Sequence, residues 1–144
     1  MGRLTSIQAT PILPGAAEGE ILASDVPLSF WGGFDPDTGD IIDRRHPLAG
    51  QNARGRVLVI PAGRGSCSGS GVLLEAIRNG TAPAAILTSH VDPIIGLGAI
   101  LGDELYAAYP VIATVTDAER DLLQTGDWLS IADDGRLTIS RRES

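Results

Sequence analysis

Residues 56–80 read RVLVIPAGRGSCSGSGVLLEAIRNG, and this stretch predicts a strand, a loop and a helix in that order. The run RVLVI is aliphatic and β-branched, which is typical of a strand buried on both faces. In VLLEAIRNG the apolar residues recur every three to four positions, and Asn79-Gly80 supplies a helix stop. The loop at 61–71 holds four glycines, three serines and the only cysteine of the chain. This order indicates a parallel α/β arrangement with a polar loop at the edge of a sheet.

The same alternation of strand and helix continues after residue 80. We expect a strand at 84–89, a helix at 93–105 that begins after Asp92, and a further strand at 109–115. Three glycines in the segment 93–105 each lower its helix propensity by roughly 1 kcal/mol. We therefore expect this helix either to pack close against another backbone or to be short and irregular. Alternation of strands and helices predicts βαβ units with parallel strands.

The flanking segments are richer in strands. Residues 3–45 hold short strand-like runs broken by turn residues, which predicts an antiparallel or meandering arrangement. A short helix is expected around 117–124, and Asp134-Gly135 between two alternating runs predicts a hairpin. The 144 residues are therefore expected to form one mixed α/β domain, with a small parallel βαβ core and surrounding antiparallel strands.

The composition excludes several classes of function. The net charge is −7, and all 11 basic residues are arginines. Nucleic-acid binding needs a basic face, and a chain without lysine has no lysine base or Schiff-base nucleophile. No apolar run is long enough to cross a bilayer, and the N-terminus lacks the pattern of a secretory signal. We expect a cytoplasmic protein that binds neither nucleic acid nor membrane.

Metal binding by this chain alone is not expected either. One cysteine cannot form an internal disulfide or hold a zinc or iron–sulfur site. His46 and His90 lie too far apart in the sequence for a recognised local metal motif. We expect His46, which precedes a proline, to be structural. His90 is kept only as a secondary candidate, because it lies at the predicted carboxyl end of a strand, where sites often lie.

The loop at 61–71 matches no standard phosphate or nucleophile motif. It lacks the lysine of a Walker A motif, Ser68 replaces the third glycine of a dinucleotide fingerprint, and no serine has the flanking glycines of a nucleophile elbow. Because the loop enters a helix, its N–H groups and Arg64 favour a carboxylate, a phosphate or a serine alkoxide. The alternative is that Ser66 or Ser68 only caps the helix and the glycines only allow a turn. Spacing alone leaves both interpretations open.

Three blocks of sequence carry a resemblance to a known family. They are SFWGGFDPDTGDIIDRRHPLAGQ (29–51), GRVLVIPAGRGSCSGSGVLLEAIRNGTAPAAIL (55–87) and DPIIGLGAI (92–100). Together they resemble the small subunit of the aconitase X family, which is homologous to the swivelling domain of aconitases. The resemblance implies a swivelling β/β/α fold like the C-terminal domain of aconitase, spanning residues 1–144.

The resemblance also implies an activity. Family members are dehydratases (hydro-lyases) that remove water from a hydroxy acid with an iron–sulfur cluster, whose cysteine ligands lie in a large subunit. This chain is therefore expected to bind no metal itself and to act only with that subunit, in a heterodimer or larger assembly. The swivelling domain donates a serine as catalytic base, and the family's G-[RK]-G-S motif corresponds here to Gly63-Arg64-Gly65-Ser66. The resemblance thus assigns the base to Ser66.

The chemistry fits that assignment. A proton next to a carboxylate is only weakly acidic, so its base must be strong and the enolate-like product must be stabilised. Arg64 either favours ionisation of the serine or clamps the substrate carboxylate. Ser70 either orients the substrate or caps the helix. The block 30–39 either lines the site, with Trp31 as part of its wall, or forms a surface turn at an interface between two domains. The residues expected to bind substrate are Arg64, Gly65, Cys67, Ser68, Ser70, Gly32 and Gly33.

Within the family two substrates are considered. The bacterial type acts on cis-3-hydroxy-L-proline, which the sequence GSCSGS favours, as does a composition typical of a GC-rich bacterial genome, with arginine in place of lysine. The archaeal type acts on 5-phosphomevalonate. A different class of function also stays open, a non-catalytic small-molecule-binding or regulatory domain that kept the swivelling fold, because fold does not fix function.

Overall fold

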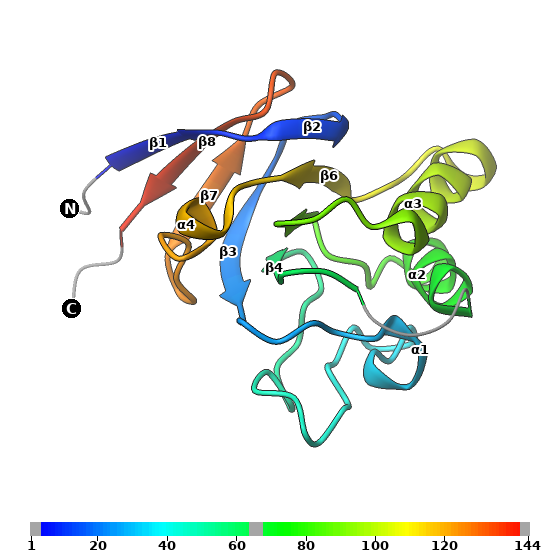
Figure 1. Ribbon diagram of the computed structural model, residues 1–144. Helices are drawn as coiled ribbons and strands as arrows, with labels where there is room; N and C mark the ends of the chain where they lie inside the picture. The colour runs from blue at the N-terminus through cyan, green and yellow to red at the C-terminus, as the bar shows by residue number, and fades with distance from the viewer. Residues whose placement is uncertain (1–3, 64–67, 142–144) are drawn as a thin grey trace.

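The computed structural model of the chain describes residues 4–63 and 68–141. Among these residues, four neighbouring strands run parallel and form the centre of a sheet (Figure 1). They lie in the order β3 (Ala17–Ala23), β4 (Val57–Val59), β5 (Ala85–Thr88) and β6 (Val111–Thr114). The parallel βαβ core predicted from the sequence is therefore confirmed.

Two helices cover one face of these strands. α2 (Ser68–Asn79) follows β4 and α3 (Pro93–Tyr106) follows β5, and the two helices pack against each other. Because successive side chains of a strand point to opposite faces, Leu58 joins the apolar core beneath the helices. Its neighbours Val57 and Val59 join a second core, between the central strands and the flanking ones. The central strands are thus buried on both faces, which explains why VLVI (57–60) is apolar throughout.

The flanking strands extend the sheet on both sides. Among the described residues the order is β1-β8-β7-β3-β4-β5-β6-β2. The flanking strands are β1 (Leu4–Gln8), β2 (Thr10–Leu13), β7 (Trp128–Ile131) and β8 (Arg136–Ser140).

The expectation of an antiparallel or meandering arrangement in residues 3–45 is right about the antiparallel pairing but not about which strands pair. β1, β2 and β3 each have an antiparallel partner, but the partners are β8, β6 and β7, and β3 also pairs in parallel with β4. An alternating pattern indicates that a segment is a strand. It does not indicate which distant strand lies beside it, because the whole fold sets the pairing.

The sheet curls round until its two edges meet. β1 and β2 lie at opposite ends of the strand order, yet only Ala9 separates them in the chain. The N–H of Ala9 donates to the carbonyl of Gly135 at 2.9 Å. Gly135 has φ +89° in the turn between β7 and β8, so the hairpin predicted from Asp134-Gly135 is confirmed.

Two short helices complete the fold. α1 (Phe30–Gly33) lies beside the start of α2, and α4 (Asp117–Arg120) follows β6 (Figure 1). A capping box between Thr116 and Glu119 begins α4, as the sequence allows. The helix ends at Arg120, earlier than the predicted residue 124, because the chain then turns and buries Leu123 in the second core.

The structure decides between the two alternatives left open for α3, close packing against another backbone and a short, irregular helix. α3 is a regular helix of 14 residues, so the expectation of a short, irregular segment is wrong. A Cβ atom on Gly98 would lie 3.0 Å from the carbonyl oxygen of Ser70, and one on Gly102 would lie 2.7 Å from that of Ala108. Close packing against other backbone therefore explains these glycines. No helix in the described ranges is long and apolar enough to cross a membrane.

Candidate functional site

The segment after β4 lies at the carboxyl edge of the parallel strands, where ligands bind in open α/β sheets. Residues 61–63 are held on both sides. The N–H of Leu28 donates to the carbonyl of Ala62 at 3.3 Å, and the N–H of Ser89 donates to the carbonyl of Pro61 at 3.0 Å. Gly63 also forms a parallel bridge with Leu28. The chain therefore enters the predicted loop from a fixed position.

Asp92 joins this segment to the start of α3. One carboxylate oxygen, Oδ2, accepts a hydrogen bond from the N–H of Gly63 at 2.6 Å. The other, Oδ1, accepts from the N–H groups of Ile94 and Ile95 at 2.9 and 3.1 Å and so caps the helix. The sequence predicted the cap from Asp92-Pro93. It did not predict the bond to Gly63, which joins residues 29 positions apart.

The start of α2 is fixed to the same turn of α3. Ser70 is 5% exposed, and its hydroxyl donates to the carbonyl of Ile94 at 2.7 Å. A Cβ atom on Gly69 would lie 3.3 Å from the Cγ2 of Ile94. Ser68, the first residue of α2, is exposed at the same end of the helix. The hydroxyl of Ser70 thus joins the two helices, which is neither of the roles considered for it, and substrate binding stays a prediction.

Four of the predicted site residues lie outside the described residues, namely Arg64, Gly65, Ser66 and Cys67. Their roles stay predictions. The structure does describe the residues on either side, Gly63 and Ser68. Both lie at the edge where the carboxyl end of the β4 segment meets the N-terminus of α2, so the surroundings expected for the loop are in place.

The two glycines of α1 are explained by backbone conformation at Gly32 and by close packing at Gly33. Gly32 has φ +81° and is exposed, and a Cβ atom there would have no neighbour within 4 Å, so the backbone angle rather than crowding favours glycine. Gly33 is buried, and its Cβ position lies 3.3 Å from the Cδ1 of Leu28. The hydroxyl of Ser29 donates to the carbonyl of Trp31 at 2.8 Å, and the Trp31 side chain is 62% exposed. Substrate binding by both glycines stays a prediction.

The two histidines differ in their surroundings. His46 is 5% exposed, its Nδ1 accepts the N–H of Leu48 at 3.1 Å, and its Nε2 lies 3.0 Å from the carbonyl oxygen of Val26. Nδ1 is thus the acceptor and Nε2 the donor, which suits the structural role expected of His46. His90 is exposed after β5, where its carbonyl accepts the Thr88 hydroxyl at 2.6 Å. In the described parts of the chain, no three histidine, cysteine, aspartate or glutamate side chains are grouped as a metal site would require.

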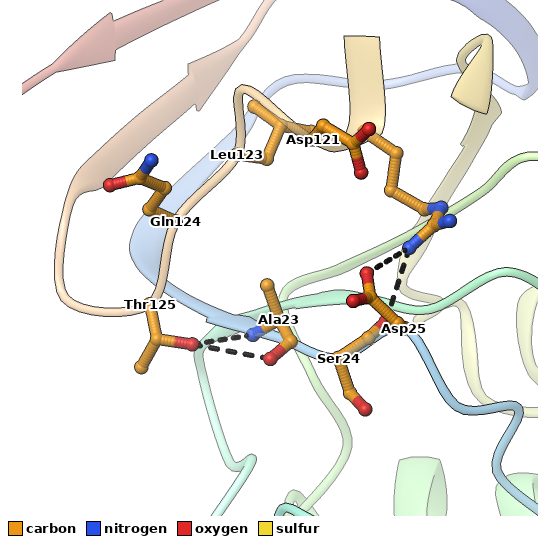
Figure 2. Close-up of a pocket in the computed structure, with 8 residues that line it drawn as sticks. Ala23, Ser24, Asp25, Asp121, Leu123, Gln124 and Thr125 are labelled. Carbon is orange, nitrogen blue, oxygen red and sulfur yellow. Dashed lines mark hydrogen bonds and ion pairs between the residues drawn. The ribbon is translucent and has the colours of Figure 1, made fainter. Parts of the chain in front are cut away.

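A separate polar pocket of about 310 Å³ lies at the same carboxyl edge, beside α4 (Figure 2). Its lining is Ala23, Ser24, Asp25, Arg120, Asp121, Leu123, Gln124 and Thr125. The guanidinium of Arg120 donates to Asp25 at 2.9 Å, and the Thr125 hydroxyl accepts the N–H of Ala23 at 2.9 Å. The described site residues predicted from the sequence, Gly32, Gly33, Ser68 and Ser70, do not line this pocket. No sequence motif pointed to it, because its residues come from two segments about a hundred positions apart.

Comparisons with known proteins match nearly the whole chain. The aconitase X swivel domain family matches residues 6–139. The chain is 50% identical over 131 residues to a cis-3-hydroxy-L-proline dehydratase of Pseudomonas aeruginosa, covering 90% of this chain and 22% of that protein. It is 42% identical over 124 residues to a phosphomevalonate dehydratase small subunit of Methanothermobacter thermautotrophicus, covering 85% of this chain and 91% of that one. The chain thus spans about a fifth of the length of the hydroxyproline dehydratases that it matches.

Solved structures agree with these matches. The holo-form crystal structure of aconitase X from Thermococcus kodakaraensis superposes with a TM-score of 0.84 at 35% identity, over 95% of this chain and 99% of that chain. The solution structure of a UPF0107 protein gives 0.82 at 32% identity, over 95% and 100%. The swivelling-domain fold expected from the sequence is therefore confirmed.

Proposed function

This chain belongs to the aconitase X swivel domain family. We propose that it is the small subunit of a dehydratase whose substrate is cis-3-hydroxy-L-proline. The observation that carries the proposal is the match over nine-tenths of this chain to about a fifth of the Pseudomonas enzyme. The other four-fifths of such an enzyme has no counterpart here. A separate large subunit supplies it in this proposal.

Ser66 is the proposed catalytic base. In the sequence it stands between Gly63, which is bonded to Asp92, and Ser68, which begins the 12-residue helix α2. The positive end of that helix dipole favours an anion near the start of α2, whether serine alkoxide or substrate carboxylate. In the reaction, Ser66 takes the proton next to the substrate carboxylate, and the hydroxyl group on the neighbouring carbon departs. Arg64 either assists ionisation of Ser66 or binds the carboxylate.

The iron–sulfur cluster typical of such dehydratases does not fit the residues of this chain. The described residues contain no group of three metal-binding side chains, and the whole sequence has one cysteine, whereas such clusters are held by several cysteine thiolates. We therefore assign the cluster to the large subunit, and we derive no step of the reaction from residues of this chain acting on it.

Dehydration of 5-phosphomevalonate is the second candidate. The chain matches 91% of the length of a separate phosphomevalonate dehydratase small subunit, so its length corresponds to that class, while its identity to the hydroxyproline enzyme is higher. Neither substrate is excluded by charge, because arginines are available to bind a carboxylate or a phosphate.

The test starts with an anaerobic pull-down of the tagged chain from its native host and a visible absorption spectrum of the product. A larger co-purifying chain with iron–sulfur absorption supports the subunit proposal, and both substrates are then assayed on the complex. A colourless protein without a partner contradicts the proposal and favours a binding or regulatory domain.

The role of Ser66 is tested on the same complex. Ser66→Ala should lower kcat by about 10²- to 10⁴-fold, as expected when a general base is removed, while the two subunits still assemble. Ser130→Ala in β7, on the antiparallel part of the sheet, is the matched control and should keep full turnover. Full turnover in Ser66→Ala would refute the assignment of the base.

A further inference from the structure

The residues on both sides of positions 64–67 are bonded to one short segment at the start of α3. On the β4 side, the N–H of Gly63 donates to Oδ2 of Asp92 at 2.6 Å. On the α2 side, the hydroxyl of Ser70 donates to the carbonyl of Ile94 at 2.7 Å. The segment 92–94 therefore sets the distance and direction between the two ends of the predicted reactive loop.

Glycine at position 63 leaves room for the Asp92 carboxylate. Its backbone does not lie in the left-handed region, so the turn itself does not require glycine. A Cβ atom at position 63 would instead lie 2.6 Å from Oδ2 of Asp92 and 3.2 Å from Cδ1 of Ile95. The absence of a side chain at Gly63 is thus what allows the carboxylate to reach the backbone N–H. The two observations, a short hydrogen bond and a glycine that makes room for it, point to the same function.

The carboxylate of Asp92 has more acceptors than a helix cap needs. Oδ1 alone accepts the N–H groups of Ile94 and Ile95, at 2.9 and 3.1 Å. An asparagine or serine would cap α3 about as well, because their side-chain oxygens accept the same N–H groups. Only a carboxylate offers a second acceptor of the same reach, and Oδ2 is the one that holds Gly63.

We propose that Asp92 is a positioning residue for the reaction, which holds Gly63, the last described residue before the segment that carries Ser66. This inference rests on the proposed function, since it gives Asp92 its effect through Ser66. Asp92 touches neither substrate nor the reacting atoms in this scheme. Its bond holds the backbone of Gly63, and a displacement of about 1 Å at a reacting group is enough to lower a rate about 100-fold.

Asp92→Asn is the sharp variant. It keeps the size of the side chain and the cap on Ile94 and Ile95, but it replaces the Oδ2 acceptor with an NH₂ donor that faces the N–H of Gly63. Asp92→Ser keeps the cap without reaching Gly63, and it tests whether loss of the acceptor alone is sufficient. Asp134→Asn is the control for the change of charge. Asp134 lies in the β7–β8 hairpin, at the end of β3 opposite to the loop, and the variant leaves an Asn-Gly turn, which suits a hairpin.

Two measurements are made on these variants. The first is amide hydrogen exchange of the ¹⁵N-labelled chain, in which the Gly63 amide should exchange at least tenfold faster in Asp92→Asn and Asp92→Ser, while the amides of Ile94 and Ile95 keep their protection. The second is steady-state kinetics of the complex with the large subunit. There kcat should fall about 10- to 100-fold in both Asp92 variants, with KM changed less than threefold and assembly unaltered, while Asp134→Asn behaves as the wild type.

The outcomes separate this inference from the proposed function. An unchanged exchange rate of the Gly63 amide in Asp92→Asn overturns the inference. A wild-type kcat in an Asp92 variant whose Gly63 amide has lost its protection overturns it too. If the wild-type complex turns over neither substrate, the proposed function fails, and the inference that Asp92 positions a residue for that reaction falls with it even where the Gly63 amide responds. A wild-type complex that is active, with a lowered kcat in the Asp92 variants only, supports both.

Discussion

Alanine at Gly102 of α3 should destabilise the fold, whereas alanine at Gly96 of the same helix should stabilise it. Both glycines lie inside the helix, so each substitution removes the same unfavourable glycine propensity, about 0.8–1 kcal/mol. A Cβ atom on Gly96 would meet nothing within 4 Å. One on Gly102 would lie 2.7 Å from both the carbonyl oxygen of Ala108 and Cδ1 of Ile77, which forces backbone or core to move.

The comparison isolates the packing contact. Because the propensity gain is common to both variants, it cancels in the difference between their free energies of unfolding. What remains is the cost of overpacking at Gly102, about 1–3 kcal/mol. Urea unfolding followed by circular dichroism measures this difference directly, with equal m values as the check that both variants unfold by the same transition. Equal stabilisation by the two alanines would refute the argument that backbone contact is the reason for glycine at 102.

Five further substitutions test other parts of the fold by the same unfolding assay. Leu73→Ala in α2, where the side chain is fully buried, should lower the free energy of unfolding by about 2–5 kcal/mol, and a loss below 1 kcal/mol would contradict its place in the core. Thr116→Ala should cost about 1 kcal/mol by removing the cap of α4, Thr116→Ser should restore most of it, and equal stability of the two would argue against the capping box. Gly32→Ala should cost about 1–2 kcal/mol because φ is +81°, while Gly71→Ala in α2 should gain stability; no loss at Gly32 would refute the backbone argument.

The core of the fold was predictable because its signals are local. The apolar run at β4, the amphipathic period of α2 and the Asp92-Pro93 start of α3 each lie within a few residues of one another. Together they were sufficient for the parallel order of β4, β5 and β6. The Asp-Gly turn likewise placed the β7–β8 hairpin, since that turn requires a backbone angle that glycine readily adopts.

The features that were missed depend on contacts between distant parts of the chain. The partners of β1, β2 and β3 lie in other parts of the sequence, and alternation within a strand does not encode them. The second hydrogen bond of Asp92 and the pocket beside Arg120 arise in the same way, because each joins segments that only folding brings together. Ser66 was assigned from a family resemblance and not from geometry, and its role rests on the kinetic test.

The antiparallel pairing of β1 with β8 places Leu4 opposite Ser140, so the first and last described strand residues are register partners across two neighbouring strands. Cα atoms paired in this way lie about 4.5–5.5 Å apart, a gap that two or three residues of linker can span. A circular permutant that joins these strand ends and opens the chain elsewhere should therefore keep the fold. The same arrangement lets such a module be joined to a longer polypeptide at either end without rerouting a strand. The relatives show both arrangements, a small subunit of about the length of this chain and a longer dehydratase of which the matching part is about a fifth.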